Sequence, residues 1–236
     1  MKAGILAAGE GSRLQSLSLC KPLVKVGGKP LFERTINYLP ATGHDNITVI
    51  FNEDERDMDF ALLPALKRSN VSHFFKSTPS SMHSLYEVMG RADLKTGEHI
   101  LIMMVDSIIR QEDFEAYMAC CKGLRADQSS VLITPYVEDE KPLTVALDSA
   151  GRVKAFQVPE GPDVPITSGV YCFSAEALPY LGACVARGDK KMRNFLKYLV
   201  EQGHEIMTFM VDKTLDVDRP EDIASAEEFL GPGLET

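Results

Sequence analysis

The sequence predicts a single-domain, three-layer α/β fold with a mostly parallel central sheet and a smaller β-rich part in its second half. Strand-like and helix-like segments alternate over about the first 125 residues, which is the order of parallel strands joined by crossover helices. The run ILIMMV at 100–105 is apolar at every position, as expected for a strand buried on both faces. A chain of 236 residues is long enough to bury the core of such a domain.

The elements of the first half follow from apolar runs and helical spacing. Strands are expected where short apolar runs end in turn-forming residues, at 2–7, 46–51, 71–75 and 100–105. Helices are expected where apolar residues recur at helical spacing, at 31–39, 55–69, 84–92 and 111–124. Pro64 interrupts the second of these helices. The resulting order is that of a Rossmann-like sheet.

The second half, from about residue 126, is richer in short strands. Four β-rich runs are expected to be strands, at 131–137, 143–148, 151–156 and 166–173. A turn at 148–151 joins the second run to the third. Helices at 174–182 and 189–202, a strand at 205–211 and a closing helix at 221–230 complete the chain. This half is expected to be mixed or antiparallel.

Composition narrows the range of partners and compartments. A formal charge of −9 argues against nucleic acid or an anionic membrane as a partner, because either would need a basic surface. The five cysteines show neither a disulfide framework nor zinc-ligand spacing, so they are expected to be reduced thiols. No signal peptide or membrane-spanning run is present. A cytoplasmic protein is expected.

The stretch LAAGEGSRL, residues 6–14, follows the first predicted strand directly. Glycines let a backbone approach anionic oxygens closely, because no Cβ intervenes, and the loop N–H groups can then bind phosphate. The pattern is not a Walker loop, and Leu14 stands where the dinucleotide fingerprint needs its third glycine. The loop therefore predicts a phosphate site of another type.

This loop resembles the signature of nucleotidyltransferases, which transfer NMP from an NTP to a sugar phosphate or similar phosphomonoester. The family pattern L-A-[AG]-G-x-G-[ST]-R-[LM], followed by K-P-[LM], is met by residues 6–14 and by Lys21-Pro22-Leu23. The alternative is an ordinary strand-turn-helix with an incidental arginine and lysine. The resemblance covers most of the chain, because two later segments also match the family pattern.

The resemblance implies a role for each residue of the loop. It assigns nucleotide binding to a set that includes one serine outside the loop: Leu6, Ala7, Ala8, Gly9, Glu10, Gly11, Ser12 and Ser84. Arg13 can donate paired hydrogen bonds to the β- and γ-phosphates. Lys21 can neutralise charge at the α-phosphate as the acceptor attacks in line; its alternative is a solvated surface lysine.

Two later segments also match the family. Residues 216–222, DVDRPED, correspond to a metal-binding segment, and residues 166–173, ITSGVYCF, correspond to the acceptor-side strand that contains Gly169. Asp106 directly follows the 100–105 run, at the edge of the sheet where α/β proteins bind ligands. The resemblance implies that Asp106, Asp216 and Asp218 hold Mg²⁺, whose preferred ligands are a few carboxylates and phosphate oxygens.

Several of these residues have a structural alternative. Asp106 could be a loop or capping aspartate. Ser84 and the polar run 77–81 could contact base and ribose, or could form a helix N-cap and its loop. Asp218 stands three residues before Glu221 with Pro220 between them, which is a good N-cap for the closing helix. We therefore expect Asp218 to be partly or wholly a cap, and we rank Asp216 above it as a metal ligand.

One departure concerns the acceptor. Many family members that use hexose 1-phosphates have a Glu-Lys-Pro segment shortly before the acceptor-side strand, whereas residues 156–160 read FQVPE. Lys141 and Lys154 lie nearby but do not match that position. The loop and the DVD triplet look closer to cytidylyltransferases that act on phosphocholine or inositol phosphate.

The expected function is Mg²⁺-dependent nucleotidyl transfer from an NTP, with CTP or UTP favoured, to a small phosphorylated acceptor. The nucleotide half is expected at about 1–125 and the acceptor half at about 126–236. A GT-A glycosyltransferase is an alternative, although its DxD normally ends a central strand, where this chain reads VDS. A regulatory homologue that binds nucleotide without catalysis is another alternative, kept open by the missing lysine.

Overall fold

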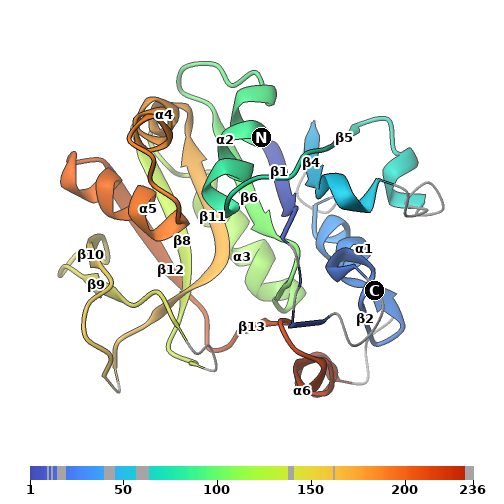
Figure 1. Cartoon of the computed structure of the whole chain (residues 1–236). Coiled ribbons are helices and arrows are strands. Elements are labelled where there is room, and N and C mark those ends of the chain that lie inside the picture. Colours follow the sequence, from blue (N-terminus) through green and yellow to red (C-terminus); the bar gives the residue numbers. More distant parts are fainter. Residues whose placement is uncertain are drawn as a thin grey trace.

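The computed structural model describes residues 1–9, 11, 13–14, 20–39, 46–56, 64–137, 141–161 and 163–231. Within them, a seven-stranded sheet has the order β12-β8-β11-β6-β1-β4-β5 (Figure 1). These strands are β12 (Glu205–Met210), β8 (Gln128–Thr134), β11 (Ile166–Ser174), β6 (His99–Met104), β1 (Lys2–Ala7), β4 (Ile47–Phe51) and β5 (Val71–Phe75). The predicted α/β class is confirmed.

The strand directions make this sheet mixed. β1 pairs in parallel with β4 and β6, and β4 pairs in parallel with β5. β12 is likewise parallel to β8, whereas β11 is antiparallel to both β6 and β8. The described sheet therefore has one reversed strand, β11, inserted between two sets of parallel strands.

Helices cover both faces of the sheet. One core cluster joins the sheet to α2 (Ser81–Arg91), α4 (Leu178–Ala186) and α5 (Met192–Glu201). The other joins it to α1 (Leu31–Asn37), α3 (Gln111–Cys121) and α6 (Pro220–Leu230). Along β1, Ile5 belongs to the second cluster and Leu6 to the first, because successive side chains of a strand point to opposite faces. The predicted three layers follow from this two-sided burial.

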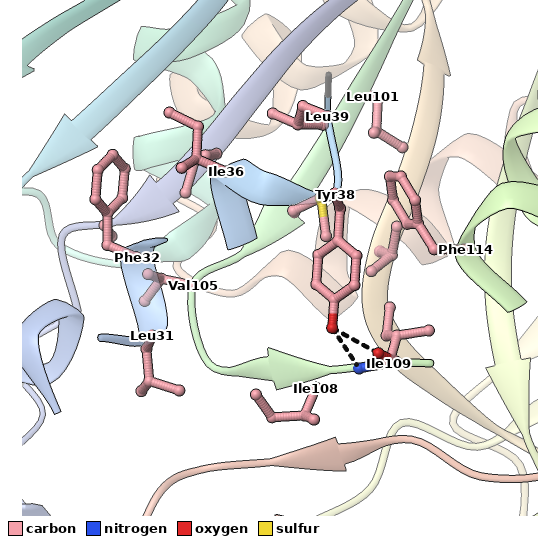
Figure 2. Packing of buried hydrophobic residues seen from close by; sticks show 14 of the residues in the cluster. Leu31, Phe32, Ile36, Tyr38, Leu39, Leu101, Val105, Ile108, Ile109 and Phe114 are labelled. Carbon is pink, nitrogen blue, oxygen red and sulfur yellow. Dashed lines mark hydrogen bonds between the residues drawn. The ribbon is translucent and has the colours of Figure 1, made fainter. Parts of the chain in front are cut away.

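The interior on the α1 side is tightly packed around an aromatic residue, Tyr38 (Figure 2). Tyr38 lies against Phe114 of α3, with ring centroids 5.1 Å apart. Its hydroxyl donates to the carbonyl of Ile109 at 2.5 Å and accepts from the Ile109 N–H at 3.3 Å. The hydroxyl thus fixes the chain that follows β6, which becomes important for the site.

Three small two-stranded sheets accompany the large one. They are β2 (Lys25–Val26) with β3 (Lys29–Pro30), β7 (Ser107–Ile108) with β13 (Leu215–Asp216), and β9 (Val145–Leu147) with β10 (Val153–Phe156). The predicted turn at 148–151 joins β9 to β10, with Asp148 accepting from the N–H groups of Ala150 and Arg152. The β-rich runs at 131–137 and 166–173 belong to the central sheet, as β8 and β11.

Some predicted boundaries differ from the structure. The helix expected at 55–69 is described only in part: residues 53–55 and 64–67 form 3-10 turns, and 57–63 lie outside the described residues. The helix expected from residue 174 begins at Leu178, after a 3-10 turn at Ala175–Ala177. In the described part of the chain, no helix has the length and apolarity to cross a bilayer.

Candidate active site

The glycine loop leaves the carboxyl end of β1 and turns toward Lys21. Leu6 and Ala7 close the strand, and Ala8 and Gly9 follow it. Gly11 has φ +54°, and a Cβ there would lie 2.9 Å from the Lys21 Cβ, so a side chain would strain both the backbone and this contact. Glu10 and Ser12 lie outside the described residues.

Asn52, just after β4, ties the loop to its neighbours. Its side chain is buried; the amide nitrogen donates to the Ala8 carbonyl at 3.3 Å. The amide oxygen accepts from the Ser77 hydroxyl at 2.7 Å and from the Asp54 N–H at 3.1 Å. One side chain therefore joins the segments that follow β1, β4 and β5. Sequence reasoning assigned it no role.

Asp106 lies at the carboxyl end of β6, as predicted, and α1 holds the chain on both sides of it. Thr35 donates from its hydroxyl to the Val105 carbonyl at 3.1 Å. Tyr38 makes the two bonds to Ile109 described above. These buried bonds fix the backbone around Asp106, so the direction of its carboxylate does not depend on an exposed loop.

The small sheet of β7 and β13 brings the C-terminal aspartates to Asp106. Asp216 pairs with Ser107 in this sheet, and the Ser107 hydroxyl donates to the Asp216 carboxylate at 2.9 Å. The Val217 N–H donates to the Asp106 carbonyl at 3.1 Å. Residues more than a hundred positions apart thus meet beside the end of β6.

Lys21 lies between two of the predicted metal ligands. Its ammonium donates to the carboxylates of Asp106 and Asp218, the latter at 2.5 Å. The Lys21 side chain is only 9% exposed, so it is not a solvated surface lysine. Arg13 donates to the other oxygen of Asp218 at 3.1 Å, from a half-exposed position. The structure thus brings Arg13, Lys21, Asp106 and Asp218 together in one ion-pair network.

The pKa values of the charged side chains reflect this network. Burial alone would lower the pKa of Lys21, but the carboxylates of Asp106 and Asp218 outweigh it and raise the pKa. Burial would raise the pKa of Asp218, but Lys21 outweighs it and lowers the pKa. Although Asp216 is exposed as a residue, loss of water around its carboxylate raises its pKa, and the charge of Asp106 raises it further.

Asp218 does not cap the closing helix, contrary to our expectation. Helix α6 begins at Pro220, and its N-cap position is Arg219. The acid that closes the turn is Asp222, which accepts from the N–H groups of Asp218 and Arg219 at 2.8 and 2.7 Å. The Asp218 carboxylate binds Lys21 and Arg13 instead.

Two adjacent cavities open at this edge of the sheet. The first, which we call the loop cavity, has a volume of about 370 Å³ and is lined by most of the predicted nucleotide residues. Its lining includes Leu6, Ala8, Gly9, Gly11, Arg13, Lys21, Ser84 and Asp218. Ala7 is not part of it, because its side chain faces the core cluster on the α1 side of the sheet. The loop cavity therefore brings the predicted phosphate loop and both predicted cations to one space.

The second, which we call the β11 cavity, has a volume of about 300 Å³. It is lined by Thr167, Gly169 and Tyr171 of β11 and by the carboxylates of Asp106 and Asp216. Gly169 has φ +71°, and a Cβ there would lie 2.2 Å from the Ser107 hydroxyl. The predicted acceptor-side glycine is therefore required both by backbone conformation and by space.

Ser80, Ser81 and Met104 line both cavities and form the wall between them. Ser80 is the N-cap residue of α2, so the polar run 77–81 does form a helix entrance. Ser84 lies within the first turns of α2, where its buried hydroxyl is 2.7 Å from the Thr78 hydroxyl. Ser84 therefore helps to hold the entrance of α2 while it lines the loop cavity.

Sequence reasoning missed four basic residues of the β11 cavity. They are Lys141, Lys190, Lys191 and Arg193. Lys141 was noted as unmatched, yet it lines the cavity beside β11. The other three come from the segment that leads into α5. A signal was present in the Lys-Lys-x-Arg run at 190–193, but the sequence alone did not show which cavity this run would face.

The aspartates can be tested as ligands of a divalent cation. The described residues contain no group of three or more His, Cys, Asp or Glu side chains arranged around one metal position. Asp106 and Asp218, however, both bind the single ammonium of Lys21, so their carboxylates already share one cation. Mg²⁺ usually takes one or two protein carboxylates together with phosphate oxygens and water. This pair of carboxylates therefore fits Mg²⁺.

The chain matches the family model described as "Nucleotidyl transferase" over residues 2–231. It belongs to the nucleotidyl transferase family. The predicted resemblance is confirmed, and the match favours this family over the glycosyltransferase alternative. Among curated relatives, a low-salt glycan biosynthesis nucleotidyltransferase of Haloferax volcanii is 24% identical, over 98% of this chain and 66% of the relative.

Solved structures of nucleotidyl transferases share the fold. An inositol-1-phosphate CTP transferase from T. maritima superimposes with a TM-score of 0.78 at 15% identity, covering 100% of this chain and 98% of that one. A CTP:phosphocholine cytidylyltransferase from Streptococcus pneumoniae gives a TM-score of 0.73 at 20% identity, covering 97% and 98%. The chain spans between 54% and 66% of the length of several curated relatives that it matches.

Proposed function

We propose that this nucleotidyl transferase catalyses Mg²⁺-dependent transfer of NMP from an NTP to a small phosphomonoester, with release of pyrophosphate. The observation that carries the proposal is the position of Lys21 between two cavities. Its ammonium binds Asp218, which lines the loop cavity, and Asp106, which lines the β11 cavity. A reaction between two bound phosphates needs a positive charge at such a junction.

In this proposal the loop cavity binds the nucleotide. The backbone of the glycine loop and the guanidinium of Arg13 would bind the β- and γ-phosphates, which leave as pyrophosphate. Arg13 is half exposed and its present partner is a carboxylate, so it can exchange that partner for a phosphate without losing a buried bond. Most residues that line this cavity belong to the first half of the chain, 1–125, and the second half contributes Asp218.

The β11 cavity would bind the acceptor. The acceptor phosphate is already an anionic nucleophile, so it can attack the α-phosphate in line without a general base or a covalent enzyme intermediate. Lys21 would then stabilise the charge that develops between the two phosphates. Its side chain is itself 9% exposed and lines the loop cavity beside Asp106, so its charge lies near the place where the two phosphates would meet.

Asp106 and Asp218 would hold Mg²⁺, and Asp216 would assist from the β11 side. Bound Mg²⁺ would neutralise phosphate charge and orient the triphosphate. Binding of the cation would require Lys21 to give up part of its present contacts, because the same carboxylates serve both cations. We therefore expect Asp106→Asn and Asp218→Asn to raise the Mg²⁺ concentration needed for half-maximal turnover more than Asp216→Asn does.

We propose CTP as the nucleotide, with UTP next. Two structures with the same fold carry CTP in their names, an inositol-1-phosphate CTP transferase and a CTP:phosphocholine cytidylyltransferase. Among the curated relatives are a cytidylyltransferase of Chlamydia pneumoniae and a uridylyltransferase of Haloferax volcanii. The small side chain of Ala8 in the loop cavity leaves room for a base.

A pyrophosphate-release assay tests the proposal. Each of the four NTPs is combined with one acceptor in the presence of Mg²⁺. The acceptors are phosphocholine, inositol 1-phosphate, glycerol 3-phosphate, glucose 1-phosphate and phosphomonoesters that carry a second acidic group. Pyrophosphate release that requires both an NTP and one acceptor is the expected result. Tight NTP binding without turnover on any acceptor would instead support the non-catalytic alternative.

A further inference from the structure

The β11 cavity is lined by side chains of both charges, with more basic than acidic ones. Two carboxylates, of Asp106 and Asp216, lie where it meets Lys21, and four basic side chains also line it. Lys141, Lys190 and Lys191 are exposed, and Arg193 is partly buried. A protein with a formal charge of −9 thus directs four of its cations toward one small cavity.

Most of these cations are not neutralised by the protein itself. Among the described residues, no carboxylate lies within ion-pair distance of Lys190, Lys191 or Arg193, although such pairs are common elsewhere on the surface. Like charges held close together repel each other, so an arrangement of this kind is unfavourable unless an anion binds between them.

Arg193 is also held in place. Arg193 donates from Nη2 to the Lys141 carbonyl at 3.1 Å, which joins the start of α5 to the segment that precedes β9. The guanidinium has further N–H donors for a ligand, because it carries five in all. No side chain caps the N-terminus of α5, and a helix N-terminus also favours an anion.

The reacting phosphate already has its own partners. Lys21 and the cation bound by Asp106 and Asp218 would serve that phosphate. Tyr171 of the same cavity lies within electrostatic range of Arg193, Asp106 and Asp216. Among the described residues, neither Lys191 nor Arg193 forms an ion pair with Asp106 or Asp216, so both can bind a different part of the acceptor.

We propose that the acceptor is a phosphomonoester with a second anionic group, a carboxylate or a phosphate, at the end remote from its reacting phosphate. Lys191 and Arg193, with Lys141 beside them, bind this second group. The proposal rests on the proposed function, because it takes the β11 cavity to be the acceptor site. It concerns only the class of acceptor, and so it can fail while nucleotidyl transfer stands.

The same charges disfavour phosphocholine, whose remote end is a quaternary ammonium. Proteins bind that group with several aromatic side chains. Among the described residues, Tyr171 is the one aromatic side chain that lines the β11 cavity, and the basic side chains would repel a cation. A neutral polyol would gain no ion pair there. An anionic remote group is the class that the side chains of this cavity recognise.

Matched acceptors test the proposal on the full chain. Glucose 1-phosphate is compared with glucuronic acid 1-phosphate and with glucose 1,6-bisphosphate, and glycerol 3-phosphate is compared with 3-phosphoglycerate. Binding is measured by calorimetry, so the result does not depend on turnover. We expect the anionic member of at least one pair to bind at least about tenfold more tightly, as one additional charged hydrogen bond would give. The carboxylate and phosphate members show which group is preferred.

Charge-reversal variants then show whether the basic side chains cause this preference. Lys191→Glu and Arg193→Glu should abolish the difference within each pair. Lys197→Glu is the matched control, because Lys197 is exposed on the same helix but does not line the cavity. Raising the salt concentration should also reduce the preference. Thermal unfolding of each variant checks that α5 remains folded.

Two results would overturn the proposal. One is equal affinity for the members of every pair, including no detectable binding of any. The other is an equal loss for both members of a pair in Arg193→Glu, which would mean that the basic side chains hold the reacting phosphate instead. Failure of the proposed function is a separate result: preferential binding of an anionic acceptor with no pyrophosphate release on any NTP would disprove transfer and leave the anion site standing.

Discussion

The loop cavity and the β11 cavity share one wall, but they are assembled in different ways. The loop cavity is made largely of one continuous stretch that follows β1, closed by the entrance of α2. The β11 cavity collects short contributions from β6, β11, β13 and the start of α5. Its basic side chains come from Lys141, before β9, and from residues 190–193.

This difference in construction matches the ligands that the two cavities would bind. Triphosphate is the same in every NTP, so one glycine loop and two cations suffice to bind it. Acceptors differ in shape and charge, and segments at element ends can change without disturbing the sheet. Variants can therefore be designed to damage one cavity while leaving the other intact.

The largest expected effect lies at the junction of the two cavities. Lys21→Ala should lower turnover about 10²- to 10³-fold, because it removes the charge that stabilises the reacting phosphates. It also leaves the carboxylates of Asp106 and Asp218 without their shared partner. Steady-state pyrophosphate release measures the loss. Lys25→Ala, at an exposed position of β2, is the control and should retain wild-type turnover; retention in both variants would remove Lys21 from the mechanism.

Gly169→Ala should damage the β11 cavity alone. A Cβ at this position would lie 2.2 Å from the Ser107 hydroxyl, which in turn positions Asp216. We expect a loss of about 2–3 kcal/mol in the free energy of unfolding from overpacking and left-handed strain, and a raised KM for the acceptor with little change for the nucleotide.

Gly188→Ala separates strain from contact in that experiment. Gly188 has a similar φ of +81°, but its Cβ would meet nothing within 4 Å. Its variant should lose only about 1 kcal/mol and should leave both KM values unchanged. If the two glycine variants behave alike, the close approach at Gly169 has no functional consequence.

Asn52→Ala should damage the loop cavity alone. It removes the bonds that tie the Ala8 carbonyl to Ser77 and Asp54, so buried polar groups lose their partners. A loss of about 1–2 kcal/mol in stability is expected, with a raised KM for the nucleotide and an unchanged KM for the acceptor. Denaturant unfolding and steady-state kinetics measure the two effects; a raised acceptor KM would contradict the separation of the cavities.

The smallest effect concerns Glu55, a buried acid that lies close to Cys20 and whose N–H donates to the Asn52 carbonyl. Burial raises its pKa from the usual 4.5 to about 7. Between these pH values the unfolded chain has released the proton while the folded chain retains it, so stability falls as pH rises. Glu55→Gln removes this loss. We therefore expect the change that Glu55→Gln causes in the free energy of unfolding to be more favourable by about 1 kcal/mol at pH 8 than at pH 4.5. Urea unfolding at the two pH values measures the difference, and an equal effect at both would show that Glu55 titrates normally.

The parts of the site that the sequence predicted are those encoded in continuous stretches. The run from Leu6 to Gly11 combines a two-sided strand with glycines that a phosphate loop requires, so both strand and loop could be read from adjacent residues. Asp106 could be placed because it directly follows an apolar strand, and the ends of parallel strands meet at one edge of the sheet.

The parts that were missed depend on contacts between distant segments. A pair of two-residue strands such as β7 and β13 has no period that a sequence pattern can reveal. The role of Asp218 was misjudged because α6 begins one residue later than a cap at Asp218 requires, with Arg219 as its N-cap, and because its partners Lys21 and Arg13 are about 200 positions away. Asn52 and Arg193 act through hydrogen bonds to distant segments, which spacing along the chain does not indicate.

The pairing of β7 with β13 has a consequence for how the protein folds. The bond from Ser107 to Asp216 spans 109 positions, and that from Lys21 to Asp218 spans 197. Contacts of such long range close large loops, and their entropy cost must be met before they become favourable. The sheet formed by β1, β4, β5 and β6 can assemble from earlier residues, so the catalytic edge should become ordered last during refolding. Pulse-labelling hydrogen exchange would then show amides of β1 protected well before the Val217 amide.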